Sequence, residues 1–226
     1  MTSVSTDSGA AAEAAAPEEA PTTAGRGSRR GWLLVIAALL VGALLGGGIA
    51  LLVPRLSTPG DDSVEAGFLR DMAVHHAQAV EMSMIVHQTS DDPEIVYLAS
   101  DIALTQHGQI GYMQAWLREW HLSPTSTQQP MAWMPDSAGS VVNGLMPGMA
   151  TPEQMADLRK ATGKDLDVQY LTLMRQHHLG GIHMAQEAEK LSSNSDVKWL
   201  AGTMVASQQG EITVIDNLLK KIQGQQ

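Results

Sequence analysis

Residues 72–82 read MAVHHAQAVEM and residues 174–184 read MRQHHLGGIHM. Each stretch has a methionine three residues before a histidine pair and a second methionine ten residues after the first. When residues 68–117 are aligned with 170–219 at an offset of 102, without a gap, twelve of the fifty positions are identical. Shared leucines and alanines could arise in any two amphipathic helices. A shared M-x-x-H-H motif, together with a shared glutamine and glycine, is not explained in that way. The sequence therefore predicts a tandem duplication.

Each copy has the apolar spacing of two amphipathic helices, with a buried position every three or four residues. The spacing predicts helices of about 25 residues. We expect the first helix to begin with a capping box from Asp62 to Glu65, and its partner to begin at Asp92-Pro93. Because the links near residues 89–92 and 191–195 are short, the helices that they join should lie antiparallel.

The predicted fold class is all-α: a ferritin-like four-helix bundle made of two tandem helical hairpins with a long crossover. The whole domain spans residues 63–222. Its first hairpin covers 63–120, the crossover 121–165 and the second hairpin 166–222. The crossover is rich in proline, and only Thr151–Ala161 has a helical pattern there.

A transmembrane helix is predicted before this domain. Residues 32–53 contain no charge and are long enough to span a bilayer. Three arginines precede them and one follows closely, so the positive-inside rule gives a single-pass protein of the cell membrane with a cytoplasmic N-terminus and an extracytoplasmic domain. We expect a disordered tail over 1–31 and a linker over 54–62. A cleaved signal peptide is the alternative, but its apolar core is usually shorter and ends at a small-residue cleavage site.

Composition excludes several classes of function. The chain has no cysteine, so disulfides and thiolate metal sites are excluded. Its formal net charge of −10 disfavours nucleic acid and mildly favours cations. No pattern of nucleophile, base and orienting group is present, so an enzyme is the less favoured class. The predicted partners are a metal ion and the membrane, while homo-oligomers and a membrane protein partner stay open.

Polar residues occupy several core positions where a bundle would prefer leucine or isoleucine. Hairpin symmetry predicts that the two histidine pairs face Gln106–His107 and Gln208–Gln209, with residues 109 and 211 one turn beyond. Burying an unpaired amide or imidazole costs about 1–3 kcal/mol. The layer therefore either pairs internally and fixes helix register, or binds a metal ion. The six positions are His75, Gln106, Gln109, His177, Gln208 and Glu211.

A soft metal ion is the metal that this layer favours. Neutral imidazole and thioether together suit Cu(I), and a methionine one turn before each histidine pair can share in ligation. A ferritin-type di-iron centre needs about four glutamates, whereas the layer has only Glu211, so a redox enzyme is the weaker alternative. The crossover holds five methionines that either converge on Cu(I) or fill space as adaptable core residues. The candidate ligands are Met72, His75, His76, Met82, Met174, His177, His178, Met184 and Glu211, together with Met146 and Met149. The other histidines are expected to be solvated or structural: His87, His107, His121 and His183.

The sequence resembles the DUF305 family of exported bacterial proteins. The resemblance rests on M-x-x-H-H-x-x-x-x-x-M in both halves, on Q-x-x-E-I at residues 208–212 and on MPGMATPE at 146–153, and it covers about residues 63–222. It implies a ferritin-like four-helix fold. One branch is similar to periplasmic copper-binding resistance proteins, which implies copper buffering, chaperoning or resistance. Gln109 departs from the family's usual glutamate and Ala150 from a frequent methionine. A structural or interaction module is the alternative function.

Overall fold

The computed structural model describes residues 28–135, 137 and 139–224, and within them it contains six helices and no strand. The chain divides into two compact units, Met1–Leu56 and Ser57–Gln226. The prediction of an all-helical fold with one apolar helix near the N-terminus is confirmed. Most of the tail that we expect to be disordered lies outside the described residues.

The first unit contains helix α1, Ser28–Ser57. Within it, Gly31–Gly48 is long and apolar enough to cross a membrane, and within the described residues it is the one such helix. A signal sequence near the N-terminus can meet the same criteria of length and apolar composition. The helix is therefore a candidate for a membrane anchor or a signal sequence.

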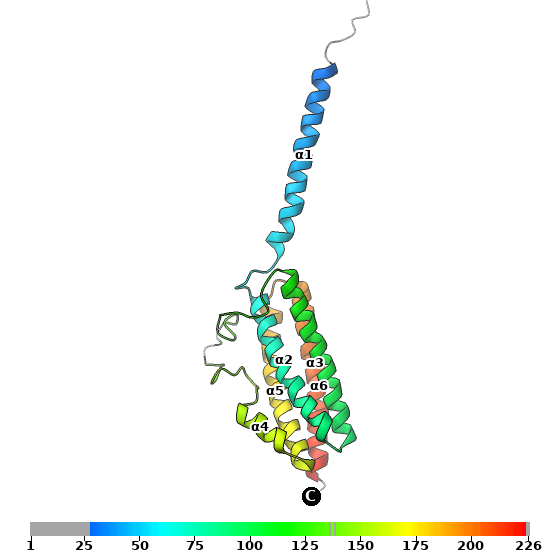
Figure 1. The fold of residues 1–226 in the computed structure, drawn as a ribbon, viewed down its shortest axis with the longest axis vertical. Coiled ribbons are helices and arrows are strands. Elements are labelled where there is room, and N and C mark those ends of the chain that lie inside the picture. The colour runs from blue at the N-terminus through cyan, green and yellow to red at the C-terminus, as the bar shows by residue number, and fades with distance from the viewer. Residues whose placement is uncertain (1–27, 136, 138, 225–226) are drawn as a thin grey trace, which may run out of the picture. The chain divides into compact units, whose positions relative to one another are not determined.

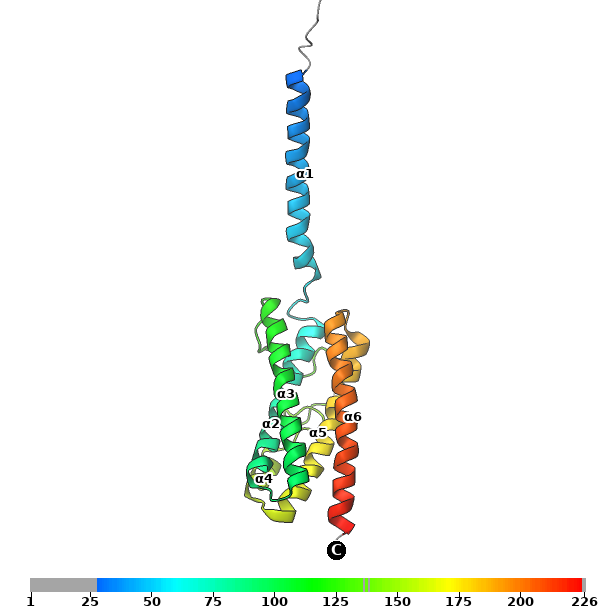
Figure 2. The ribbon, with the colours of Figure 1, turned by 90° about the vertical axis from the view of Figure 1, so that its right-hand side faces the viewer.

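Four long helices and one short helix make up the second unit (Figure 1). Its first hairpin consists of α2 and α3, the crossover carries α4, and the second hairpin consists of α5 and α6. The hairpins meet chiefly through α2 and α5, and in Figure 2 the helices α3 and α6 lie in front of this central pair. The bounds are α2 Val64–Thr89, α3 Pro93–Glu119, α4 Pro152–Lys160, α5 Gly163–Leu191 and α6 Ser195–Gly224.

Side-chain caps set several of the helix starts. Asp92 caps α3 by accepting a hydrogen bond from the Glu94 amide at 2.9 Å, as the Asp-Pro pair predicts. Helix α4 has the predicted capping box between Thr151 and Gln154. The capping box predicted from Asp62 to Glu65 is wrong, because Ser63 caps α2 and the Glu65 side chain turns to the other hairpin.

A carboxylate at the start of each hairpin binds the turn of the other hairpin. Glu65 is buried, and its Oε1 accepts hydrogen bonds from the Ser192 hydroxyl at 2.8 Å and the Ser193 amide at 2.7 Å. Asp167, which is 102 positions after Glu65, accepts one from the Ser90 hydroxyl at 2.6 Å. Serines 90 and 192 are also 102 positions apart. The same contact therefore occurs in both directions, as two hairpins packed about an approximate two-fold axis would make it.

Removing the Glu65 carboxylate should destabilise the second unit. Burial pushes the pKa of Glu65 up, but the hydrogen bonds to its carboxylate outweigh this and lower it, so the group is charged at neutral pH. A Glu65→Ala variant leaves buried donors of the α5–α6 turn unpaired, and we expect it to lose about 2–3 kcal/mol of unfolding free energy in urea. Glu81→Ala breaks only an exposed ion pair with Arg159 and should lose less than about 1 kcal/mol. Equal losses in both variants would contradict a clamp at Glu65.

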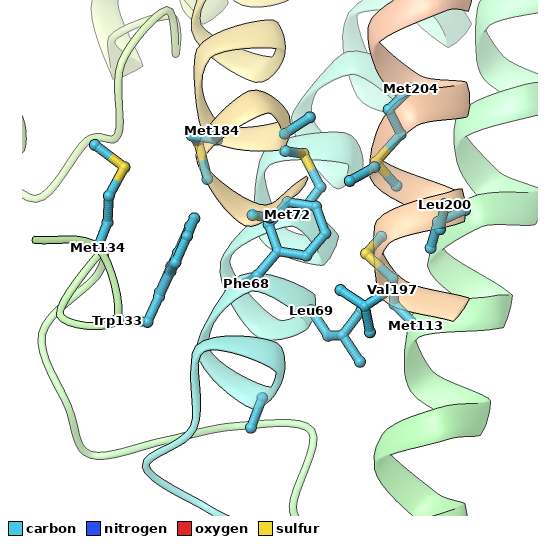
Figure 3. Packing of buried hydrophobic residues seen from close by; sticks show 14 of the residues in the cluster. Phe68, Leu69, Met72, Met113, Trp133, Met134, Met184, Val197, Leu200 and Met204 are labelled. Carbon is cyan, nitrogen blue, oxygen red and sulfur yellow. The ribbon is translucent and has the colours of Figure 1, made fainter. Parts of the chain in front are cut away.

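The core of the second unit consists of two apolar clusters. One includes Phe68, Met72 and Met184, and the crossover residues Trp133 and Met134 pack onto it (Figure 3). The other includes Met82, Tyr170 and Met174. Along α2 and α5 the two histidine pairs lie between these clusters. The buried histidines therefore lie in the middle of the core, between two apolar clusters.

Candidate metal centre

The four histidines of the repeated motif lie in the core, two on α2 and two on α5. His75, His76, His177 and His178 are fully buried. The rings of His75 and His177 stack with their centroids 3.8 Å apart and a tilt of 36°. The ring of His178 lies 6.4 Å from that of His177. The predicted convergence of the two histidine pairs in one core is thus present.

The same ring atom, Nε2, forms a hydrogen bond in all four histidines. His75 donates to the Pro147 carbonyl at 3.0 Å, and His177 donates to the His75 carbonyl at 2.9 Å. A carbonyl oxygen can only accept, so in both rings the proton is on Nε2. His76 pairs with Gln109 Oε1 at 2.7 Å, and His178 pairs with Glu211 Oε2 at 2.5 Å.

Burial keeps three of these imidazoles neutral. It lowers the pKa of His75 to about 4 and that of His76 to about 3, and neighbouring histidines add to the effect. Burial and the same neighbours lower the pKa of His177 well below its ordinary value. With Nε2 protonated and the ring neutral, the Nδ1 atom of each of these three rings carries a lone pair at pH 7.

These lone pairs have no hydrogen-bond partner within the described protein. The Nδ1 atoms of all four histidines are unpaired, and so are both side-chain amide atoms of Gln106 and Gln208. Among the described residues, every buried side-chain nitrogen or oxygen without a partner belongs to one of these four histidines or two glutamines. Native proteins rarely leave such atoms unpaired. An imidazole whose Nε2–H is held by a carbonyl or carboxylate while Nδ1 is free has the arrangement of a metal ligand.

The crossover passes directly over the histidines. Gly148 has a φ of +81°, and a Cβ there would overlap the Gln176 carbonyl oxygen, so glycine is required on both counts. A Cβ at Gly180 would likewise overlap the Pro147 carbonyl oxygen. The Gln78 amide holds the segment by accepting from the Ala150 amide at 2.7 Å and donating to its carbonyl at 2.9 Å. Of the four buried histidines, His75 alone hydrogen-bonds to the crossover.

The candidate methionines do not converge on one point. Met72, Met146 and Met184 are buried in the cluster on one side of the histidines, and the half-buried Met149 packs against it. Met82 and Met174 lie in the cluster on the other side. Each face of the histidine layer therefore has thioethers from both repeats. In the crossover, Met131 and Met134 join the first cluster and Met155 the second.

Two details of the predicted layer differ from the structure. His76 and His178 bond to Gln109 and Glu211, one helical turn beyond the partners expected from hairpin symmetry. The role of Gln78 could not be predicted, because its alanine-rich surroundings give no signal. The Gly180-Gly181 pair inside a helix was a signal, because such glycines often mark the close approach of another backbone. The four other histidines are exposed as expected: His87, His107, His121 and His183.

In the described part of the chain, no group of three or more histidine, aspartate or glutamate side chains has an arrangement that could hold a metal ion by itself. Zn(II) usually takes four such ligands or cysteines. A soft ion that also accepts thioethers needs fewer nitrogen ligands from this layer. The donor set present, unpaired neutral imidazoles with methionines above and below, fits Cu(I) better than it fits Zn(II).

Comparisons with known proteins agree with this fold. Residues 65–219 match the model of a family described as a domain of unknown function, DUF305. The crystal structure of a DUF305 protein from Streptomyces coelicolor, predicted to be secreted, is 44% identical, with a TM-score of 0.67, over 72% of this chain and 96% of that one. A DUF305 fragment from Deinococcus radiodurans is 28% identical, with a TM-score of 0.59, over 70% and 96%.

More distant similarity extends to a protein crystallised with copper. CopM in its Cu(I)-bound form is 20% identical, with a TM-score of 0.55, over 70% of this chain and 96% of that one. At that identity the likeness shows the fold alone. No curated protein sequence matches the chain.

Proposed function

This chain belongs to the DUF305 family, and we propose that it is a membrane-anchored extracytoplasmic protein that binds copper as Cu(I) and buffers, chaperones or detoxifies it. The domain that carries this function spans residues 63–222 as a ferritin-like bundle of two hairpins. The metal is cargo bound through histidine nitrogen and methionine sulfur. No covalent catalysis is part of the proposal.

The observation that carries the proposal is the set of four buried, unpaired Nδ1 atoms. Leaving them unpaired costs about 1–3 kcal/mol each, so a ligand that needs such lone pairs is the simplest compensation. His75, His76, His177 and His178 would supply nitrogen, with Glu211 supporting His178. Met72 and Met184 on one side, and Met82 and Met174 on the other, would supply sulfur. Met146 and Met149 would contact the metal ion on its way through the crossover.

The choice of Cu(I) rests on ligand chemistry and on one comparison. Imidazole and thioether favour soft ions, and thioethers, unlike thiols, form no disulfides outside the cytoplasm. CopM, which has the same fold, has been crystallised with Cu(I), Cu(II) and silver. The apolar helix α1 and the secreted assignment of the Streptomyces relative favour a location outside the cytoplasm. We propose that α1, centred on the predicted span 32–53, anchors the chain with residues 1–31 in the cytoplasm.

Copper binding is tested by titrating the full chain in detergent micelles with Cu(I) in competition with a Cu(I) chelator. We expect the wild type to take Cu(I) from the chelator. The double variant His75→Ala, His177→Ala should bind at least about 100-fold more weakly because two ligands are lost, with helical circular dichroism retained. A matched double variant of exposed histidines, His87→Ala with His183→Ala, should bind like the wild type. A wild type that cannot compete with a weak chelator would contradict the proposal.

A structural module is the second candidate, and one contact favours it. The His177 side chain donates to the backbone of His75 and thereby ties α5 to α2 at a fixed register. If the layer serves only this purpose, the double alanine variant should lose stability while the wild type binds no metal. The titration above therefore separates the two functions.

A further inference from the structure

The two halves of the histidine layer have the same geometry but differ in charge. Gln109 and Glu211 are 102 positions apart and hold equivalent places in the two repeats. The Gln109 amide oxygen accepts from His76 at 2.7 Å, and the Glu211 carboxylate accepts from His178 at 2.5 Å. One half of the layer thus carries a negative charge where the other half carries a neutral amide.

Glu211 is the one carboxylate hydrogen-bonded to these histidines among the described residues. Its side chain is only 11% exposed, so water screens its charge poorly. Asp216 lies about one turn further along α6, but it pairs with Arg175 at 2.7 Å and adds little net charge. The four imidazoles are neutral when they present lone pairs to a ligand. The layer as a whole therefore carries about one negative charge.

We propose that the neutral Gln109, set against Glu211 in the other repeat, limits the layer to a single formal negative charge and so favours a soft monovalent cation over a divalent one. This inference rests on the proposed function and names the ion class of the same site. A monovalent ion makes the occupied layer neutral. A divalent ion leaves an uncompensated positive charge in the core, and burying such a charge is costly. Glu211 also raises the ligand strength of His178 through their hydrogen bond.

The test uses substitutions that move the charge between equivalent positions. Glu211→Gln removes it, Gln109→Glu adds a second one, and the double variant with both changes transfers it to the first repeat. Gln209→Glu adds a charge at an exposed neighbour and serves as the control. The probes are Ag(I), a monovalent soft ion without redox chemistry, and Zn(II), each measured on the full chain in micelles by competition with a chelator.

We expect Glu211→Gln to weaken Ag(I) binding by about 10- to 100-fold, the usual effect of losing an outer partner of a ligating histidine. Zn(II) binding should weaken more, because a divalent ion loses twice the attraction, so the ratio of Zn(II) to Ag(I) affinity should fall. Gln109→Glu should shift the ratio of Zn(II) to Ag(I) affinity toward Zn(II) by about tenfold or more. The double variant should regain the wild-type ratio, and Gln209→Glu should keep it. Gln109 is half-buried, so Gln109→Glu keeps the test usable if Glu211→Gln fails to fold.

The outcomes separate this inference from the proposed function. If the wild type binds Ag(I) and the single variants weaken both ions alike without rescue in the double variant, Glu211 is only structural and the charge inference is wrong. If the wild type binds neither Ag(I) nor Cu(I), the inference and the proposed function fail together. A ratio that moves in opposite directions in the two single variants supports both.

Discussion

Lowering the pH from 7.5 to 4 is expected to reduce the unfolding free energy of the metal-free second unit by more than about 5 kcal/mol. The cause is the buried histidines. In the unfolded chain they titrate near pH 6.5, whereas burial lowers the folded pKa of His75 to about 4 and that of His76 to about 3. Each pKa unit corresponds to about 1.4 kcal/mol, so His75 alone contributes about 3 kcal/mol.

The sign follows from proton binding. Above pH 6.5 these histidines are neutral in both states and do not affect stability. Between pH 6.5 and the folded pKa the unfolded chain binds more protons, so stability falls as the pH falls. Burial raises the pKa of Asp71 and Asp167, which gives an opposite slope above their ordinary value of 3.8. Both carboxyls keep hydrogen bonds that oppose this rise, so the histidines should dominate.

Urea unfolding of the full chain in micelles, followed by circular dichroism at several pH values, measures this loss. The variant His75→Leu with His177→Leu should lose most of the slope between pH 6.5 and 4, while the exposed-histidine variant His87→Ala with His183→Ala should keep it. A wild-type stability that stays constant from pH 7 to pH 5 would mean that the imidazoles are hydrated or already protonated in the folded state.

Replacing the two unpaired glutamines with leucine should stabilise the metal-free protein. Gln106 and Gln208 are 2% exposed, and neither side-chain amide has a partner within the described protein. An unpaired buried amide costs about 1–3 kcal/mol, and leucine fills a similar volume without that cost. The double variant Gln106→Leu, Gln208→Leu should therefore gain about 2 kcal/mol or more of unfolding free energy at pH 7.5.

This result would separate a binding layer from a structural layer. A layer whose amides are paired within the folded protein should gain nothing or lose stability when they are removed, whereas one whose amides lack a partner until a ligand binds should gain stability. Urea unfolding at pH 7.5 measures the change, and Gln114→Leu on the exposed face of α3 is the control, with an expected change below about 0.5 kcal/mol. Destabilisation by the double leucine variant would favour the structural module.

Much of the fold could be predicted because the relevant signals are local or repeated. Asp92-Pro93 and Thr151-Pro152 mark helix starts by their own chemistry. The repeated M-x-x-H-H predicted that the histidines of both copies reach one core, because duplicated hairpins pack about an approximate two-fold axis. The stacked rings of His75 and His177 agree with that reasoning.

What could not be predicted depends on contacts between distant segments. Glu65 has the spacing of a capping residue, but it bonds to Ser192 and Ser193, more than 120 positions away. The partner of His76 is one turn beyond its expected place, because sequence fixes a hairpin's facing residues only to within about a turn. The bond from His75 to Pro147 depends on the path of an irregular crossover.

The most direct measurement follows the histidine ring nitrogens by ¹⁵N NMR while Ag(I) is added to the full chain in micelles. Before addition, His75 and His177 should show protonated Nε2 and unprotonated Nδ1 at pH 7. One equivalent of Ag(I) should shift the Nδ1 resonances of the buried pairs and leave those of His87 and His183 unchanged. Protons on Nδ1 in the metal-free protein, or Ag(I) binding that leaves every buried Nδ1 unshifted, would contradict a metal centre in this layer.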